Sequence, residues 1–70
     1  MSNKLEICAN QVLAFALSIV EDVRAMSVPE REEMKREARN EIKSETFSVR
    51  IASTLMLEAI DVVEKENGEE

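Results

Sequence analysis

Apolar and polar positions recur with a helical period along most of the chain, and they divide it into three segments. In the first segment, residues 4–26, apolar side chains cover roughly 200° of a helical wheel, whereas a surface helix usually has a stripe little wider than about 100°. This pattern predicts a helix that needs packing partners on more than one side.

The other two segments differ strongly in polarity. The second, residues 29–43, is mostly charged, and its apolar stripe is confined to Met34, Ala38 and Ile42. The third, residues 44–66, is apolar again over about half of its wheel. Because Leu, Met, Ala, Glu, Lys and Arg dominate and all favour helix, we predict an all-α chain.

The sequence marks the boundary between the first two segments clearly, but the boundary between the second and third segments is ambiguous. Ser27 and Glu30 have the S-x-x-E spacing of a capping box, which predicts a helix start there. No Gly or Pro follows Glu30 within the last two segments, which favours one long helix. Ser44 and Thr46 are residue types that cap helices, which favours a break instead, and both alternatives stay open. The tail, residues 67–70, predicts a helix stop and a frayed end.

The small size of the chain indicates self-association. A domain of 70 residues buries only about 60% of the surface of its unfolded chain, so a lone monomer has marginal stability. Small folds compensate with disulfides, a structural metal or oligomerisation. The single Cys and the absence of His exclude an internal disulfide and a zinc site with four ligands. Oligomerisation is what remains.

The first helix and the third segment have broad apolar faces of similar length, so we expect them to pack antiparallel as a hairpin. Two helices cannot cover such wide faces, and symmetric dimers are the commonest oligomers of soluble proteins. The predicted fold is therefore an all-α antiparallel helical hairpin or three-helix unit that assembles as a homodimeric four-helix-type bundle. The predicted oligomer interface contains Val12, Phe15, Ile19, Val23, Leu55, Met56 and Val63.

The amino-acid composition excludes several classes of catalytic and nucleotide-binding site. Without His the chain has no imidazole base or nucleophile–His pair, and a single Gly excludes glycine-rich phosphate loops. We predict no catalytic residues, no metal site and no cofactor. The net charge of −6 argues against a nucleic-acid or membrane-surface partner, since both are anionic.

The cysteine content and the apolar runs bear on localisation. A single Cys without a disulfide framework is typical of the reducing cytoplasm, where we expect the protein. No signal peptide is evident. The longest apolar run, residues 12–20, is much shorter than the about 20 residues of a membrane-spanning helix.

The charged segment is the most regular feature of the sequence. Basic residues recur every four positions from Arg31 to Lys43, acidic residues recur every four from Glu33 to Glu45, and the apolar stripe lies between the two edges. An apolar seam flanked by opposite charges selects a helical partner and its orientation. The predicted partner-binding residues are Arg31, Met34, Lys35, Ala38, Arg39, Ile42 and Lys43.

These observations predict a non-enzymatic interaction module that binds a macromolecular partner, which we expect to be a protein, and regulates or inhibits it. One alternative is a small-anion or nucleotide binder. Its cations are Arg31, Lys35, Arg39 and Arg50.

A second alternative rests on two pairs of carboxylates at E-x-x-E and E-x-x-D spacing. They resemble short elements of the all-α MazG-type nucleotide pyrophosphatases, and the resemblance implies a magnesium-dependent nucleotide hydrolase. The residues concerned are Glu30, Glu33, Glu58 and Asp61.

Overall fold

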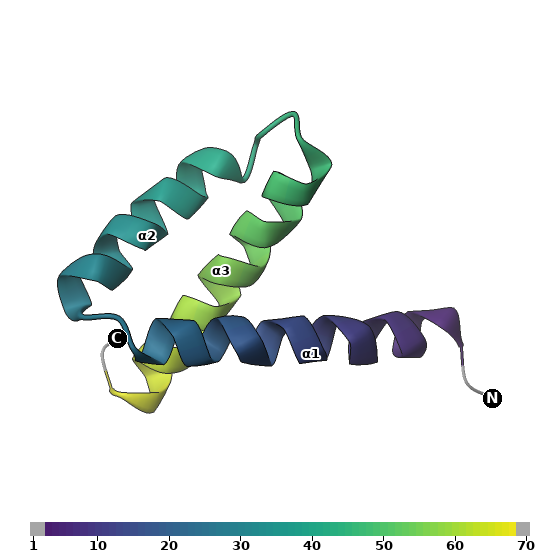
Figure 1. Cartoon of the computed structure of the whole chain (residues 1–70), viewed down its shortest axis with the longest axis horizontal. Helices are drawn as coiled ribbons and strands as arrows, with labels where there is room; N and C mark the ends of the chain where they lie inside the picture. The colour runs from purple at the N-terminus through teal and green to yellow at the C-terminus, as the bar shows by residue number, and fades with distance from the viewer. Residues whose placement is uncertain (1–2, 69–70) are drawn as a thin grey trace.

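The computed structural model describes residues 3–68, which form three helices and no strand (Figure 1). Helix α1 spans Lys4–Arg24, α2 spans Val28–Glu41 and α3 spans Phe47–Glu66. Helix α3 packs against both α1 and α2. The prediction of an all-α chain is therefore confirmed, in the form of a three-helix unit.

Local sequence accounts for the starts of the first two helices. The Asn3 Oδ1 accepts a hydrogen bond from the Glu6 N–H at 2.8 Å and caps α1. At the start of α2, the Glu30 N–H donates to Ser27 Oγ at 3.3 Å and the Ser27 N–H donates to Glu30 Oε1 at 3.0 Å. The predicted capping box is thus present, with Ser27 as the N-cap.

The chain breaks between α2 and α3, so the alternative of one long helix is wrong. Helix α2 ends at Glu41, and α3 starts after Thr46, whose side chain makes no capping hydrogen bond. Ser44 Oγ instead accepts from the Thr46 N–H at 3.1 Å, and Arg50 Nη1 donates to the Ser44 and Glu45 carbonyls at 2.8 and 3.1 Å. The Arg50 side chain thereby ties the first turn of α3 to the connection that precedes it.

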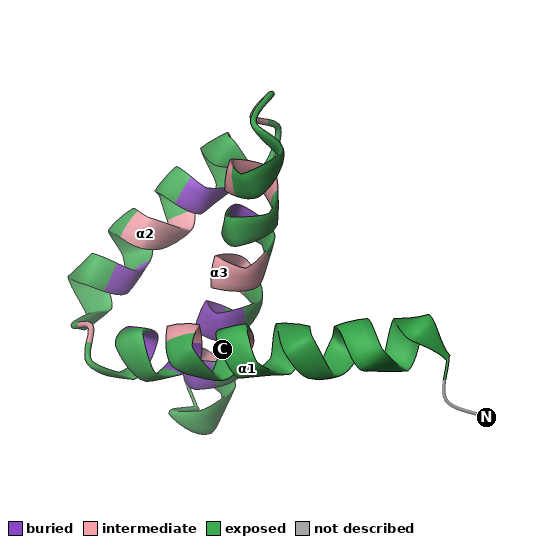
Figure 2. Ribbon diagram, turned by 45° about the vertical axis from the view of Figure 1, so that its right-hand side comes forward, coloured by how far each residue is buried: buried purple, intermediate pink, exposed green. Residues whose placement is uncertain are grey.

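The hydrophobic core lies where the C-terminal halves of α1 and α3 cross, beside the start of α2 (Figure 2). Val23 is 0% exposed, and Ile60 and Val63 are each 1% exposed. The Arg24 guanidinium closes this end, because its Nε and Nη2 donate to the two carboxylate oxygens of Glu66 at 3.1 and 2.8 Å. The remaining core and half-buried residues around it are Val20, Ala59, Ile19, Met26, Met34 and Met56.

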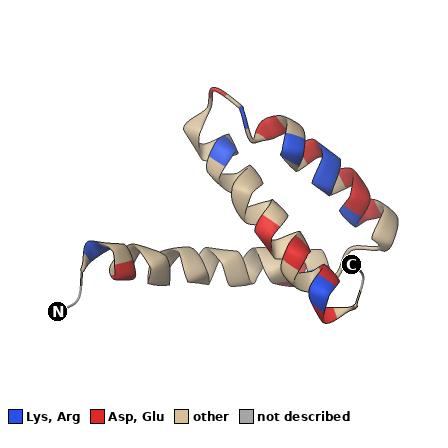
Figure 3. Ribbon diagram, turned by 180° about the vertical axis from the view of Figure 1, so that it is seen from behind, with Lys and Arg blue, Asp and Glu red and all other residues tan. Residues whose placement is uncertain are grey.

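The antiparallel hairpin of the structure is formed by α2 and α3, which lie side by side (Figures 1 and 3). The predicted hairpin of the first helix with the third segment is therefore corrected. Helix α1 crosses α3 only with its C-terminal half, and its N-terminal half diverges from α3 and stands exposed (Figure 2). Because α2 follows α1 after a short turn and α3 returns antiparallel to α2, the C-terminal ends of α1 and α3 come together, and these two helices cannot pair antiparallel.

The crossing makes the chain extended for its size. The radius of gyration is 13.2 Å, whereas a compact chain of this length has about 11 Å. The accessible surface is 5375 Å², compared with about 4,400 Å² for a compact monomer of this mass. None of the helices within residues 3–68 combines the length and apolar character needed to cross a bilayer.

Candidate interaction surfaces

Large apolar side chains of α1 and α3 face water where the two helices diverge. Leu5 is 77% exposed, Phe15 70% and Phe47 68%. Where the helices begin to separate, they enclose an open groove of about 390 Å³. We call the following set the α1–α3 surface: Leu5, Cys8, Val12, Phe15 and Ile19 of α1 with Phe47, Ile51 and Leu55 of α3.

The α1 side of this surface carries no charge. Between Glu6 and Glu21 the helix has no Asp, Glu, Lys or Arg, as the uncoloured stretch of α1 in Figure 3 shows. Cys8 lies within this stretch and is exposed as a free thiol, although its place on an apolar face predicts burial. Soluble monomers seldom expose more than a few hundred Å² of apolar surface in one patch, and larger patches are typical of interaction sites.

The predicted oligomer interface divides into two groups. Val12 and Phe15 are exposed, and Ile19, Leu55 and Met56 are half-buried. Val23 and Val63 are enclosed in the core of a single chain. The prediction is revised for these last two valines, because the crossing of α1 over α3 already buries them.

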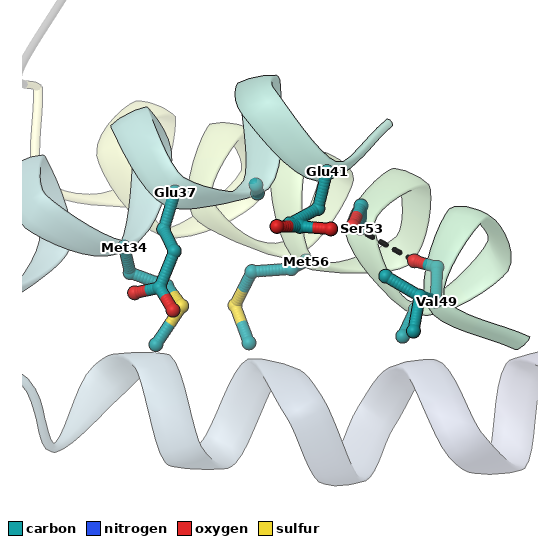
Figure 4. A pocket seen from close by; sticks show the side chains of 8 residues that line it. Met34, Glu37, Glu41, Val49, Ser53 and Met56 are labelled. Atoms are coloured by element: carbon teal, nitrogen blue, oxygen red, sulfur yellow. Dashed lines mark hydrogen bonds between the residues drawn. The ribbon is translucent and has the colours of Figure 1, made fainter. Parts of the chain in front are cut away.

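A second groove, of about 190 Å³, runs between α2 and α3 (Figure 4). Ala38 and Ala52 keep it open because their side chains are short. The Ser53 hydroxyl is occupied within α3, because its Oγ donates a hydrogen bond to the Val49 carbonyl at 2.8 Å. The groove, which we call the α2–α3 groove, is lined by Met34, Glu37, Ala38, Glu41, Val49, Ala52, Ser53 and Met56.

Two carboxylates form the α2 rim of this groove. Glu37 and Glu41 are exposed, lie one helical turn apart and reach over the groove from α2 (Figure 4). Within the part of the chain that the structure describes, neither has an ion-pair partner. The acidic edge is visible in the sequence, but only the docking of α2 reveals that these two residues border a groove.

The predicted partner-binding edge of α2 is largely used within the chain. Arg31 is 5% exposed, and its Nη1 donates to the Met26 carbonyl at 3.1 Å. Lys35 Nζ donates to Glu64 Oε2 at 2.7 Å, and this hydrogen bond raises the pKa of Lys35. Ala38 is buried against α3. The seam therefore selects α3 of the same chain as its helical partner.

The rest of that predicted edge is less enclosed. Met34 is half-buried beside the core, whereas Arg39, Ile42 and Lys43 are exposed. Arg39 shares a shallow pocket with Lys35, and the same pocket contains the carboxylates of Asp61 and Glu64. The accessible remainder of the edge is thus Arg39, Ile42 and Lys43.

The cations of the predicted anion site do not converge. Arg31 turns toward the end of α1, and Arg50 donates to the turn before α3 and lies over the Phe47 ring at 5.7 Å. Lys35 is paired with Glu64, and Arg39 lines a pocket that Asp61 and Glu64 also line. The structure therefore provides no concentrated positive site from these four side chains.

In the part of the chain that the structure describes, no three of the four carboxylates of the predicted magnesium site are grouped, and Glu58 is exposed on α3. Glu30 caps α2, and the Ser27 N–H that donates to it lowers its pKa. Glu33 pairs with Arg36 at 2.8 Å, and Asp61 pairs with Lys65 at 3.1 Å. Among residues 3–68, no three His, Cys, Asp or Glu side chains are grouped to hold a metal ion.

Comparison with known proteins gives no relative: no protein-family model, curated protein or solved structure matches the chain.

Proposed function

We propose that this protein is a non-enzymatic interaction module that acts as a homodimer and binds a protein partner, which it regulates or inhibits. The observation that carries the proposal is the exposure of the α1–α3 surface. Val12, Phe15 and Ile51 are between 45% and 70% exposed although their helices are regular. Complete burial of a fully exposed side chain of this kind contributes about 1.5–3 kcal/mol, and these three still have a large part of that exposure to lose, so this surface favours association.

The accessible surface area of the single chain supports dimerisation, because it exceeds that of a compact monomer of the same mass. The chain exposes about 1,000 Å² more than a compact monomer of its mass. A protein–protein interface of standard size buries about 800 Å² of each partner. The excess is therefore of the size that one dimer interface removes.

The ionisable groups support binding rather than catalysis. The chain has no His, and three of the four carboxylates considered for chemistry are engaged, Glu30 in the capping box and Glu33 and Asp61 in ion pairs. These contacts stabilise the helices and occupy the three carboxylates, which supports a structural role for them rather than proton transfer.

We place the partner site at the α2–α3 groove. Its apolar floor suits an aliphatic side chain, and its rim residues Glu37 and Glu41 suit Lys or Arg on either side of that anchor. The net charge of −6 steers cationic partners toward the protein at low ionic strength.

Light scattering after size-exclusion chromatography tests the assembly. At micromolar concentration we expect twice the chain mass of 7.9 kDa. A folded species at the mass of one chain contradicts the proposed dimer.

Affinity capture with variants tests the partner site. Immobilised wild-type protein and Glu58→Lys, which reverses a charge at an exposed position of α3, should capture the same partner from host lysate. Glu41→Lys makes the same change in net charge at the groove rim and should lose that partner. Equal capture by both variants contradicts the assignment of the groove.

A further inference from the structure

Within the proposed dimer, we infer that the two copies of α1 pack antiparallel about a two-fold axis at Val12, and that each places Leu5 in the groove between α1 and α3 of the other. The second copy is thus the occupant of the α1–α3 surface. The inference rests on the proposed dimer and adds its orientation and register.

The register of the two α1 helices is inferred from the spacing of the apolar residues along α1. Leu5, Val12 and Ile19 follow one another at intervals of seven and therefore lie along one line of α1. Leu5 is 77% and Val12 45% exposed, and Ile19 is half-buried at the edge of the core. Antiparallel pairing centred on Val12 sets Leu5 of each copy opposite Ile19 of the other, so all three positions are covered.

The residues between these positions differ in size in a complementary way. On one flank of α1 the same register sets Phe15, which is 70% exposed, beside Cys8 of the second copy, and on the other flank it sets Ala9 beside Ala16. The large Phe15 side chain therefore meets a small one, and the two alanines let the helices approach closely on the other flank.

The electrostatics of α1 permit this contact. No charged side chain lies between Glu6 and Glu21, so two copies of this acidic protein meet here without like charges in apposition. Lys4 and Asp22 lie on the same flank of the helix, and antiparallel pairing brings Lys4 of one copy near Asp22 of the other. Neither residue has an ion-pair partner among residues 3–68 of its own chain.

The groove between α1 and α3 receives the tip of the second α1. Ile19 lines this groove together with Ile51 and Leu55 of α3. A Leu5 side chain set opposite Ile19 therefore enters an apolar space of about 390 Å³. The two-fold axis repeats the contact, and the assembled core consists of α1 and α3 from both copies.

Cysteine cross-linking tests the register. In a Cys8→Ser background, Val12→Cys brings two thiols together at the axis, and mild oxidation should shift the protein from the monomer to the dimer band on a non-reducing gel. Leu17→Cys in the same background is the matched control, because Leu17 is 56% exposed but lies on another side of α1. Circular dichroism checks that both variants are helical.

The outcomes separate this inference from the proposed dimer. Cross-linking at Val12→Cys but at neither Leu17→Cys nor the native Cys8 supports the antiparallel register. Rapid cross-linking through native Cys8 indicates a parallel pair and overturns it. A dimer by light scattering in which Val12→Cys cross-links no faster than Leu17→Cys overturns the register alone, whereas a monomer overturns both proposals.

Discussion

Lys35 of α2 and Glu64 of α3 form an ion pair that is largely shielded from water, with Nζ 2.7 Å from Oε2 and side chains 17% and 18% exposed. The hydrogen bond from Lys35 to Glu64 shows how the charged edge of α2 is used. It orients α2 on α3 within one chain, as an edge charge does between the helices of a coiled coil.

Loss of this pair should destabilise the hairpin. Glu64→Gln should lower the free energy of unfolding by about 1–2 kcal/mol, because a shielded hydrogen bond between charged groups contributes more than an exposed one. Urea denaturation of the wild type, Glu64→Gln, Lys35→Met and the double variant gives the coupling energy. Arg39→Met, at an exposed neighbouring position, is the control and should change stability little. Additive effects of the two single variants contradict the coupling.

Stability should decline in acid partly through Glu66. The hydrogen bonds from Arg24 lower the pKa of Glu66, so the unfolded chain binds its proton at a higher pH than the folded chain does. The contribution of Glu66 is therefore fully present above the ordinary Glu pKa of about 4.3 and disappears as the pH falls through the lowered value. Thermal melts should show Glu66→Gln less stable than the wild type at neutral pH and equally stable in strong acid. A constant difference across this range contradicts the linkage.

Arg31 should behave as a structural residue. Its guanidinium donates to the Met26 carbonyl in the turn between α1 and α2, and its stem is enclosed, so Arg31→Ala removes both a charged hydrogen bond and packing. We expect a loss of about 2–3 kcal/mol in the free energy of unfolding. Arg36→Ala, which removes an exposed pair with Glu33, should cost about 0–1 kcal/mol and serves as the control. Equal stability of the two variants in urea contradicts a structural role for Arg31.

The sequence predicted the helices well because their signals are local. The capping box at Ser27 and the apolar period of α1 need only neighbouring residues to act. A helical wheel gives the angular position of each side chain but not the angle at which two helices cross. For that reason the divergence of α1 from α3, and the consequent burial of Val23 and Val63 within one chain, could not be predicted.

For a related physical reason, the sequence did not reveal that part of the predicted partner-binding edge is used within the chain. A regular row of cations in a sequence suggests an exposed helix edge. In the structure, Arg31 donates to the Met26 backbone carbonyl and Lys35 donates to Glu64, and these acceptors allow both side chains to be largely buried. The groove beside Glu37 and Glu41 arises from the small Ala38 and Ala52 on facing helices, a pairing that depends on how α2 docks.

A charge at Phe15 should dissociate the dimer while leaving the chain folded. Phe15 lies outside the intramolecular core and is 70% exposed, so Phe15→Asp removes no contact with Val23, Ile60 or Val63. In the proposed dimer the same aspartate is buried without a partner, which costs several kcal/mol. Sedimentation velocity should therefore report the mass of one chain, and circular dichroism should report retained helix. Leu17→Asp, a matched change at an exposed position away from the α1–α3 surface, should stay dimeric. If Phe15→Asp sediments as a dimer, the second copy does not cover this surface, and the apolar side chains at the divergence of α1 and α3 require a different occupant.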